Sequence, residues 1–390
     1  MEFFTYRNFL QMTELLSWVA CAYGLVLGVV GLLAPALSRR GARPALAGAG
    51  APVDGGSELD GGSGRVLDAG SRMLVVLVLL CFALAFGANV LRYMEVRHWP
   101  AQTMYEVIPM GVTAGYLSTI GLLFVLGIHR MRGSARAFGD LFLALILFGG
   151  AFTTHYVLGL DPTGKPLPPA LQSYWFSTHI TAYMVGYFTL FIAAVGAFLH
   201  FTFQFWRGML DRANHPAPRL VMWGVPLLVL AASPFGGGGM ALGVGILALT
   251  GGITWANYRF AGGMPWFDRW QSGADRFTWL IFVVGFPFLT SGLVQGSLWA
   301  QEAWANYWAW DSKEVSALIS WVFYAVYLHL RYVAGWRGEK GMMLLCAGAL
   351  SIFITFQLFG YLPDSQKSLH RYTDMESVPS EGMMQPPSAE

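Results

Sequence analysis

The sequence predicts an all-α fold, a polytopic bundle of about ten transmembrane helices. Hydrophobic residues make up 55% of the 390 residues and charged residues only 12%, whereas ordinary soluble domains carry roughly 25% charged residues. The mean hydropathy is +0.50. The apolar stretches are long and continuous, which favours spanning helices over the alternating segments of about ten residues typical of membrane β-barrels. This composition excludes a soluble globular enzyme.

Ten apolar stretches account for the predicted spans, because a helix needs about 20 residues to cross a bilayer. The sixth and seventh are short. The run from Pro234 to Gly239 between them fits either a hairpin turn or a break in one longer helix. In order, the spans are expected at residues 12–35, 73–93, 107–128, 138–158, 179–203, 220–235, 239–256, 277–297, 314–332 and 341–361.

The distribution of basic residues predicts the orientation, with both termini outside. In that orientation the cytoplasmic segments hold 17 of the 24 basic residues, as the positive-inside rule requires. Merging the sixth and seventh spans would remove this asymmetry, so two spans or a re-entrant pair are favoured. The cytoplasmic basic residues are Arg39, Arg40, Arg43, Arg65, Arg72, Arg130, Arg132, Arg136, Arg207, Arg212, Arg219, Arg259, Arg269, Arg276, Arg331, Arg337 and Lys340.

Two segments lack the large apolar residues that would favour a folded state. Residues 41–70 are rich in glycine and alanine and are expected to form a disordered cytoplasmic loop. The tail at 373–390 is expected to be disordered outside. The chain is therefore divided into a first transmembrane helix at 1–40, the loop, a transmembrane core at 71–372, and the tail.

Other patterns narrow the functional classes. No basic block is present that could follow a phosphate backbone, which argues against nucleic-acid binding. Cys21, Cys81 and Cys346 lie in separate apolar stretches without a CxxC pair, so the chain is neither a thiol–disulfide enzyme nor a c-type cytochrome. The apolar run from Leu15 to Leu37 is too long for a cleavable signal peptide.

A tryptophan-rich loop, residues 299–314, lies between the eighth and ninth spans on the predicted outer side. Four tryptophans fall within 12 residues there and are followed by two acids and a lysine. If the loop is helical, Trp304, Trp308 and Asp311 share one face. Such a face is an aromatic platform with a carboxylate at its edge, on which a planar ligand such as a porphyrin could stack. An interfacial aromatic belt is the alternative.

Histidines offer candidate ligands, because imidazole commonly binds heme iron and other metals. His179 and His370 flank the tryptophan-rich loop on its side of the membrane and could ligate one iron from opposite sides. His329 lies near the inner end of the ninth span, about 27 Å along the helix from Asp311. A packing role is expected for His155, and solvated positions at inner helix ends are expected for His129, His200 and His215.

These residues resemble a known family. The stretches Trp304–Glu314 and Leu318–Arg331 resemble the tryptophan-rich (WWD) signature of heme-handling proteins, most closely the CcsA (ResC) type of system II cytochrome c maturation. The family usually has glycine where Ala305 stands and proline where Ser312 stands. The apolar insert at 205–265 is longer than the family core. Further matching segments are Trp99–Glu106, Leu171–His179, Gly285–Trp299, Gly335–Gly338 and Leu369–Tyr372.

The resemblance implies a cytochrome c heme-lyase-type enzyme that carries heme b across the membrane. His329 would help to hold heme within the membrane. His179 and His370 would then ligate the iron outside, while the vinyl groups face the CxxCH thiols of an apocytochrome c. Asp311, Lys313 or outer arginines could contact the propionates. The heme platform would consist of Trp304, Trp308, Trp310 and Asp311, and Trp299 would also bind the cofactor.

The resemblance also implies partners and a location. The second ligand opposite His329 would come from a CcsB/ResB-like membrane protein, with His129 and His200 as alternatives within the chain. A thiol-reducing pathway and membrane lipid complete the expected partners. The chain would lie in a bacterial plasma membrane or a thylakoid-type membrane, with the tryptophan-rich loop on the outer, periplasmic side.

Three other functions stay open at this point. A heme exporter or chaperone of the CcmC-like kind would share the platform but attach no heme covalently. A membrane b-type cytochrome would need ligand pairs within the bilayer, and His179 and His200 are too far apart, about 31 Å along one helix, to share an iron. A secondary transporter would need acids within the spans or broken helices at the midplane. The predicted spans contain almost no acids.

Overall fold

The chain forms a bundle of helices, which confirms the predicted all-α class. The computed structural model describes residues 4–41, 61–164, 166–231 and 236–357, and these residues contain no strand. The α-helices are α1 (Tyr6–Gly41), α2 (Gly61–Val96), α3 (Met104–Val125), α4 (Gly133–Leu158), α5 (Tyr174–Leu210), α6 (Arg219–Ala231), α7 (Gly236–Ala256), α8 (Pro265–Trp304), α9 (Ser312–Val333) and α10 (Glu339–Gln357).

Each of the ten predicted spans corresponds to one of these helices. Six of them, α1 to α5 and α8, are long and apolar enough to cross a membrane. Helix α6 has 13 residues and is about 20 Å long, which is shorter than the roughly 30 Å hydrocarbon core. The molecule is an integral membrane protein in which the described part of α6 is shorter than a full span.

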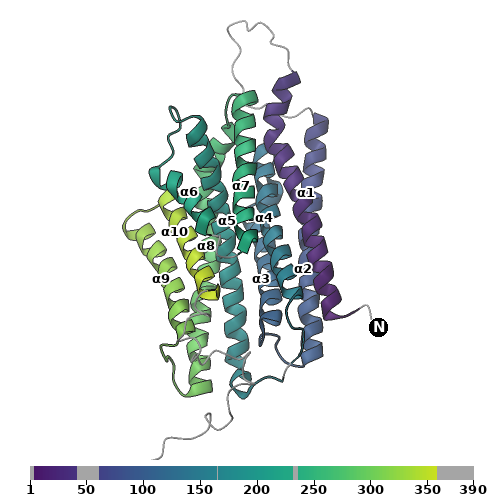
Figure 1. Cartoon of the computed structure of the whole chain (residues 1–390), viewed down its shortest axis with the longest axis vertical. Helices are drawn as coiled ribbons and strands as arrows, with labels where there is room; N and C mark the ends of the chain where they lie inside the picture. Colours follow the sequence, from purple (N-terminus) through teal and green to yellow (C-terminus); the bar gives the residue numbers. More distant parts are fainter. Residues whose placement is uncertain (1–3, 42–60, 165, 232–235, 358–390) are drawn as a thin grey trace, which may run out of the picture.

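The helices run along one axis, so the bundle has two distinct ends (Figure 1). The end where α1 begins at Tyr6 also carries the connection from α8 to α9 and is called the turn end here. The opposite end holds the last turn of α1, the first turn of α2 and the connection from α5 to α6. The start of α1 and the tryptophan-rich loop therefore lie at the same end of the bundle, as the predicted topology requires.

Helices α5 and α8 form a close antiparallel pair in the middle of the bundle. Glycines permit the approach: a Cβ on Gly186 would lie 2.7 Å from the backbone nitrogen of Leu289, and one on Gly285 would lie 2.9 Å from Cγ of Leu190. Small residues at helix contacts are the usual means of close packing in membranes, where burial supplies little driving force. The pair provides a rigid frame that reaches the turn end.

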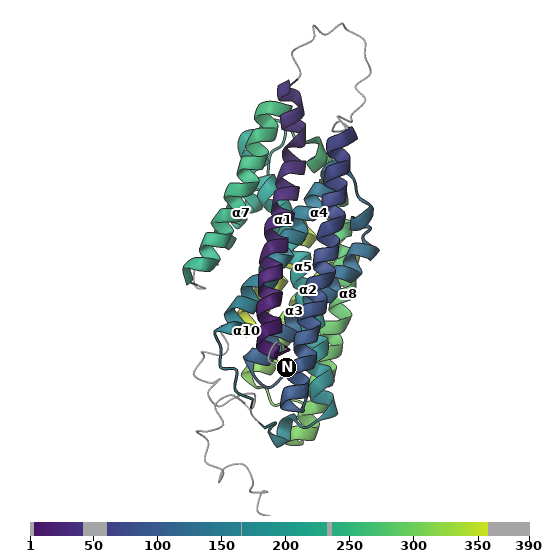
Figure 2. The same ribbon diagram turned by 90° about the vertical axis from the view of Figure 1, so that its right-hand side faces the viewer.

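The first four helices pack beside this pair. Helices α1 and α4 are in close contact at Gly28, where a Cβ would lie 2.8 Å from the backbone nitrogen of Leu141. Figure 2 shows α7 beside α1 towards the opposite end. The Asn257 side chain, just after α7, donates a hydrogen bond of 3.0 Å to the Leu32 carbonyl. This bond ties the longer apolar insert to the first helix.

Helices α9 and α10 complete the bundle, and a partly buried ion pair fixes α9 to α8. Arg331 donates two hydrogen bonds to Asp275, at 2.8 and 2.9 Å, and the Gly338 backbone nitrogen donates a third at 2.8 Å. The guanidinium also lies 4.3 Å from the Trp279 ring centroid. Bidentate arginine–carboxylate pairs fix orientation, so this contact sets the register of α9 against α8.

One predicted boundary differs from the structure. Helix α2 begins at Gly61, so its first turns occupy part of the segment 41–70 that was expected to be disordered. The remainder of that segment at 42–60, and the predicted tail at 373–390, lie outside the described residues.

Candidate functional site

His179 lies in the second turn of α5 at the turn end, and its ring is held by α8. Its Nδ1 lies 2.8 Å from the carbonyl oxygen of Gly292. A carbonyl only accepts hydrogen bonds, so Nδ1 carries the proton and the lone pair lies on Nε2. Histidines that bind metals are commonly oriented in this way, with the second ring nitrogen donating to a carbonyl or carboxylate.

Besides the Gly292 carbonyl, three residues surround the His179 ring: Trp299, Tyr183 and Gly296. It stacks on Trp299 with centroids 5.7 Å apart and planes at 26°, and it meets Tyr183 edge-on at 4.8 Å. Gly296 on α8 is the remaining neighbour. A Cβ on Gly296 would lie only 2.6 Å from Cε1 and 2.7 Å from Nδ1 of the imidazole. Gly296 therefore provides the space that the ring needs in this position.

The tryptophan-rich loop is not one continuous helix, so the predicted shared face of Trp304, Trp308 and Asp311 is wrong. Helix α8 ends at Trp304, and α9 begins only at Ser312. Ala305 adopts the left-handed conformation with φ 54° and Trp310 does so with φ 58°. Left-handed residues end a helix, which explains why the helical spacing does not continue through the loop.

The four tryptophans instead form two edge-on pairs on either side of the helix end. Trp299 and Trp304, both on α8, have centroids 4.8 Å apart. Trp308 and Trp310, both in the turn, have centroids 6.0 Å apart. Trp299 is almost fully buried at 1% exposure, whereas Trp310 is 72% exposed. The tryptophans thus range from Trp299, buried against the His179 ring, to Trp310, exposed in the turn.

Acidic side chains hold the turn in place. The Glu314 carboxylate accepts hydrogen bonds from the backbone nitrogens of Ala309, at 2.9 Å, and Asp311, at 3.2 Å. The Asp311 carboxylate in turn caps α9 by accepting from the Lys313 backbone nitrogen at 3.2 Å, which forms a reciprocal capping box with Glu314. Asp311 therefore has a structural role in addition to its predicted position at the platform edge.

Two side-chain contacts fasten the end of α8 to the start of α5. The Trp299 Nε1 donates to the carbonyl of Ala170 at 2.8 Å. Ser173, the N-cap of α5, donates to the carboxylate of Glu302. The tryptophan-bearing end of α8 and the histidine-bearing start of α5 are therefore one structural unit.

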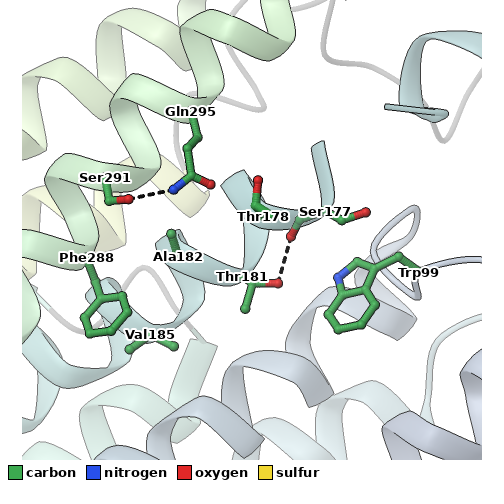
Figure 3. A pocket seen from close by; sticks show the side chains of 9 residues that line it. All are labelled: Trp99, Ser177, Thr178, Thr181, Ala182, Val185, Phe288, Ser291 and Gln295. Atoms are coloured by element: carbon green, nitrogen blue, oxygen red, sulfur yellow. Dashed lines mark hydrogen bonds between the residues drawn. The ribbon is translucent and has the colours of Figure 1, made fainter. Parts of the chain in front are cut away.

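A cavity of about 380 Å³ opens between α5 and α8 at the side of α5 that bears Thr178 and Thr181, with Trp99 on its far side (Figure 3). His179 is not among its lining residues. Thr178 and Thr181 direct their hydroxyls to carbonyls of their own helix, and Gln295 donates to Ser291 at 2.6 Å. The wall is consequently mostly apolar. Volumes of this size and lining are typical of small-molecule sites.

His329 lies on the face of α9 that points away from the bundle. It is exposed, as are Ile319, Val322 and Val326 on the same helix. The buried side of α9 carries Tyr327 and its neighbours instead. An exposed imidazole on an apolar helix face has room for a ligand that a second protein completes.

The alternatives within the chain are unsuited to pair with His329. His129 directs Nδ1 to the Leu123 carbonyl at 2.8 Å and accepts from Arg130 Nε at 3.1 Å, so both ring nitrogens are engaged. The solvated position expected for His200 is wrong: its side chain is fully buried, because it stacks on Phe267 and lies 3.9 Å from the carboxylate of Glu339.

Two other histidine predictions have different outcomes. His155 is the more exposed partner of an ion pair with Glu14, at 2.8 Å between Nδ1 and Oε1, rather than a buried packing residue. His370, the predicted second outer ligand, lies outside the described residues. In the described part of the chain, no group of three or more His, Cys, Asp and Glu side chains could hold a metal ion.

Sequence reasoning missed the residues that position the site. Gly292 and Gly296 receive the His179 ring, and Glu314 holds the turn. Two glycines four residues apart within an apolar span are a recognised sign of close helix contact. This spacing could have indicated that Gly292 and Gly296 lie against another helix. The Glu314 contacts depend on the turn geometry, for which the local sequence offers no comparable sign.

The fold and the site together define a helical integral membrane protein with an aromatic, histidine-bearing site at one end of its bundle. The chain belongs to the Cytochrome C assembly protein family, whose pattern matches residues 71–364. Its role is therefore in cytochrome c maturation, and the family handles heme.

Individual relatives agree with this membership. The cytochrome c biogenesis protein CcsA of Gloeothece citriformis is 28% identical over 315 residues, which cover 76% of this chain and 85% of that protein. The CcsA proteins of Crocosphaera subtropica, 29% identical over 323 residues and covering 76% and 86%, and of Heterosigma akashiwo, 28% identical over 297 residues and covering 76% and 81%, are similar.

Proposed function

We propose that the chain carries heme b to the outer face of the membrane and presents it to apocytochrome c for thioether formation. His179 and His370 bind the iron there, and the tryptophans of the turn contact the porphyrin. The site would then act as the heme-binding half of a cytochrome c heme lyase. Heme supplies two vinyl groups, to which the two CxxCH thiols of the apocytochrome add.

The observation that carries this proposal is the state of the His179 ring. The carbonyl of Gly292 leaves the lone pair on Nε2, and Trp299 and Gly296 fix the plane of the ring. This is the arrangement expected of an axial ligand whose orientation matters. An aromatic belt residue needs no such preparation.

The contribution of the protein to the reaction is positioning. The nucleophilic sulfurs belong to the apocytochrome, so no side chain of this protein has to form a covalent bond. Correct orientation of two reactants can by itself contribute several kcal/mol to a rate. Fixed contacts between α5, α8 and the turn, such as the Trp299 bond to Ala170, support a rigid platform for that purpose.

The exposed side of α9 supports the second part of the proposal, a CcsB/ResB-like partner in the membrane. A helix of that partner would cover Ile319, Val322 and Val326 and would bring the ligand opposite His329. Heme would bind there first and then move to the site at the turn end. A heme bound through His329 should be lost when the partner is absent.

The proposal is tested with the full chain, a partner membrane protein and a CxxCH reporter in a host without its own maturation system. Heme that stays on the reporter after denaturation measures ligation. His179→Ala, His370→Ala and Trp308→Ala should each abolish it. His155→Gln is the matched control, because His155 lies on α4, away from the proposed site, and should keep the wild-type yield.

The remaining outcomes separate the competing functions. Heme that copurifies with the complex, without covalent product on the reporter, would contradict the ligation step and favour an exporter. A folded complex that holds no heme at all would contradict the heme site and return the tryptophans to an interfacial belt. Unchanged reporter yield in His179→Ala would contradict the assignment of that ligand.

A further inference from the structure

A second cavity lies at the turn end, away from α5, α8 and α9. It has a volume of about 420 Å³ and is formed where α1 begins, α2 ends and α3 begins, with the Pro162 segment at its side. Tyr6, Arg7 and Tyr105 are among its lining residues. Nothing in the proposed heme site uses these side chains.

Its inner wall is built around a buried arginine. Arg92 is 1% exposed, and its Nε and Nη2 each lie 3.0 Å from the carboxylate of Glu106, which is equally buried. The guanidinium lies 5.4 Å from the ring centroids of both Tyr6 and Tyr105, and Nη1 donates to the Pro162 carbonyl at 3.1 Å. This wall is fixed and does not depend on a ligand.

Two polar atoms of the wall have no hydrogen-bond partner among the described residues: Arg92 Nη2, which still lies 3.0 Å from the Glu106 carboxylate, and the Tyr105 hydroxyl, which has no charged group so close. The Tyr105 hydroxyl is buried and has no hydrogen-bond partner among the described residues, although the Tyr105 carbonyl accepts from Tyr6 at 2.8 Å. A buried hydroxyl without a partner costs on the order of 1–3 kcal/mol, and native proteins rarely leave one. An acceptor group bound in the cavity would satisfy it.

The charged side chains that line the cavity indicate which kind of acceptor group would bind there. Arg7 is an exposed cation at the cavity, and Glu95, which Arg92 contacts at 3.3 Å, is 56% exposed. Together with Glu106 behind Arg92, the two cations are balanced by two carboxylates. A purely anionic ligand would gain Arg7 but face Glu95. A zwitterion satisfies both, with its anionic part on Arg7 and Tyr105 and its cationic part on Glu95.

The surroundings are apolar, which identifies the rest of the ligand. Phe4 and Met94 line the cavity and are 70% and 58% exposed, and Val90 and Phe86 continue the exposed apolar surface along α2. Both α1 and α2 are apolar enough to cross a membrane. A ligand with a zwitterionic head and apolar chains would follow this surface, as a phospholipid does.

We propose that this cavity binds the head group of an amine-bearing zwitterionic phospholipid, phosphatidylethanolamine. Its phosphate accepts from Tyr105 and Arg7, and its ammonium donates to Glu95. The acyl chains lie along the exposed apolar side of α2. A resident lipid at this position would fasten the ends of α1, α2 and α3 to one another.

The test uses the full-length chain, purified in mild detergent, with native mass spectrometry to count retained lipids after reconstitution in mixed phosphatidylethanolamine and phosphatidylglycerol bilayers. Arg7→Gln and Tyr105→Phe should each retain at least fivefold less phosphatidylethanolamine. Arg97→Gln is the matched control, because Arg97 is also exposed at the turn end but does not line the cavity; its lipid count should equal that of the wild type.

A second measurement separates lost binding from a folding defect. In lipid-free detergent, Tyr105→Phe should melt at or above the wild-type temperature, since the unpartnered hydroxyl is gone, yet it should lose the rise in Tm that phosphatidylethanolamine gives the wild type. Equal retention by all variants would overturn the proposal. So would preferential retention of phosphatidylglycerol, or an equal rise in Tm with inorganic phosphate alone.

Discussion

Adding one methyl group at Gly296 should displace the imidazole of His179 and weaken heme binding at the outer site. In Gly296→Ala the new Cβ would begin 2.6 Å from Cε1, whereas ordinary contacts begin at 3.4 Å. The ring therefore has to retreat by about 0.8 Å. A retreat of that size along the 2.8 Å bond to the Gly292 carbonyl lengthens it to about 3.6 Å, which is no longer a hydrogen bond.

The expected cost follows from these distances. Forcing an extra methyl group into a packed contact typically costs about 1–3 kcal/mol, and a lost hydrogen bond contributes about 1 kcal/mol. Part of this free-energy cost reduces heme binding, because the His179 imidazole is no longer held in one tautomer and one orientation. At 1.4 kcal/mol for each factor of ten, heme affinity should fall by about tenfold to a hundredfold. Visible absorption spectra of the purified complex measure the bound heme.

Gly273→Ala is the matched control on the same helix. A Cβ there meets nothing within 4 Å, and replacing glycine by alanine within a helix is otherwise favourable. This control should bind heme as the wild type does. A wild-type spectrum and reporter yield in Gly296→Ala would refute the argument, and equal losses in both variants would show that the effect does not come from the His179 contact.

Four further variants test the turn and the ion pair that holds α9 to α8. Ala305→Gly relieves a left-handed alanine (φ 54°) that costs about 1 kcal/mol, so Tm in detergent should rise by about 2 °C; Ser312→Pro, at the first helical position of α9, should not lower it. Glu314→Gln weakens the bonds to two turn amides and should reduce covalent heme on the reporter severalfold without changing Tm. Asp275→Asn leaves Arg331, 9% exposed, without a counter-ion and should cost about 3 kcal/mol, seen as a lower Tm; an unchanged Tm would count against that ion pair.

The helices were predictable from the sequence because their signal is strong and local. Long apolar runs bounded by charged or glycine-rich segments define α1 to α5 and α8 without reference to tertiary contacts. The asymmetry of basic residues also separated α6, described over 13 residues, from α7. The start of α2 at Gly61 was missed because glycine-rich composition resembles that of a disordered loop.

The site was predictable in composition and not in geometry. Tryptophan and histidine residues in the right order could be recognised from their types, and His179 does lie against Trp299. Which partner fixes the ring could not be foreseen, because Gly292 and Gly296 lie more than a hundred residues away on another helix. A non-local contact of this kind depends on how α5 and α8 pack.

The shape of the turn had a sign in the sequence that the helical interpretation overlooked. The family usually has glycine at position 305 and proline at 312. Glycine is the residue that suits a left-handed helix end, and Ala305 has that conformation here. Proline is favoured at the first residue of a helix and requires an extended residue before it; Ser312 begins α9, and Asp311 is extended, with ψ 152°. Ala305 and Ser312, the two departures from the family, therefore mark the two ends of the break between α8 and α9. A continuous helix through both positions would not explain why the family prefers glycine at one and proline at the other.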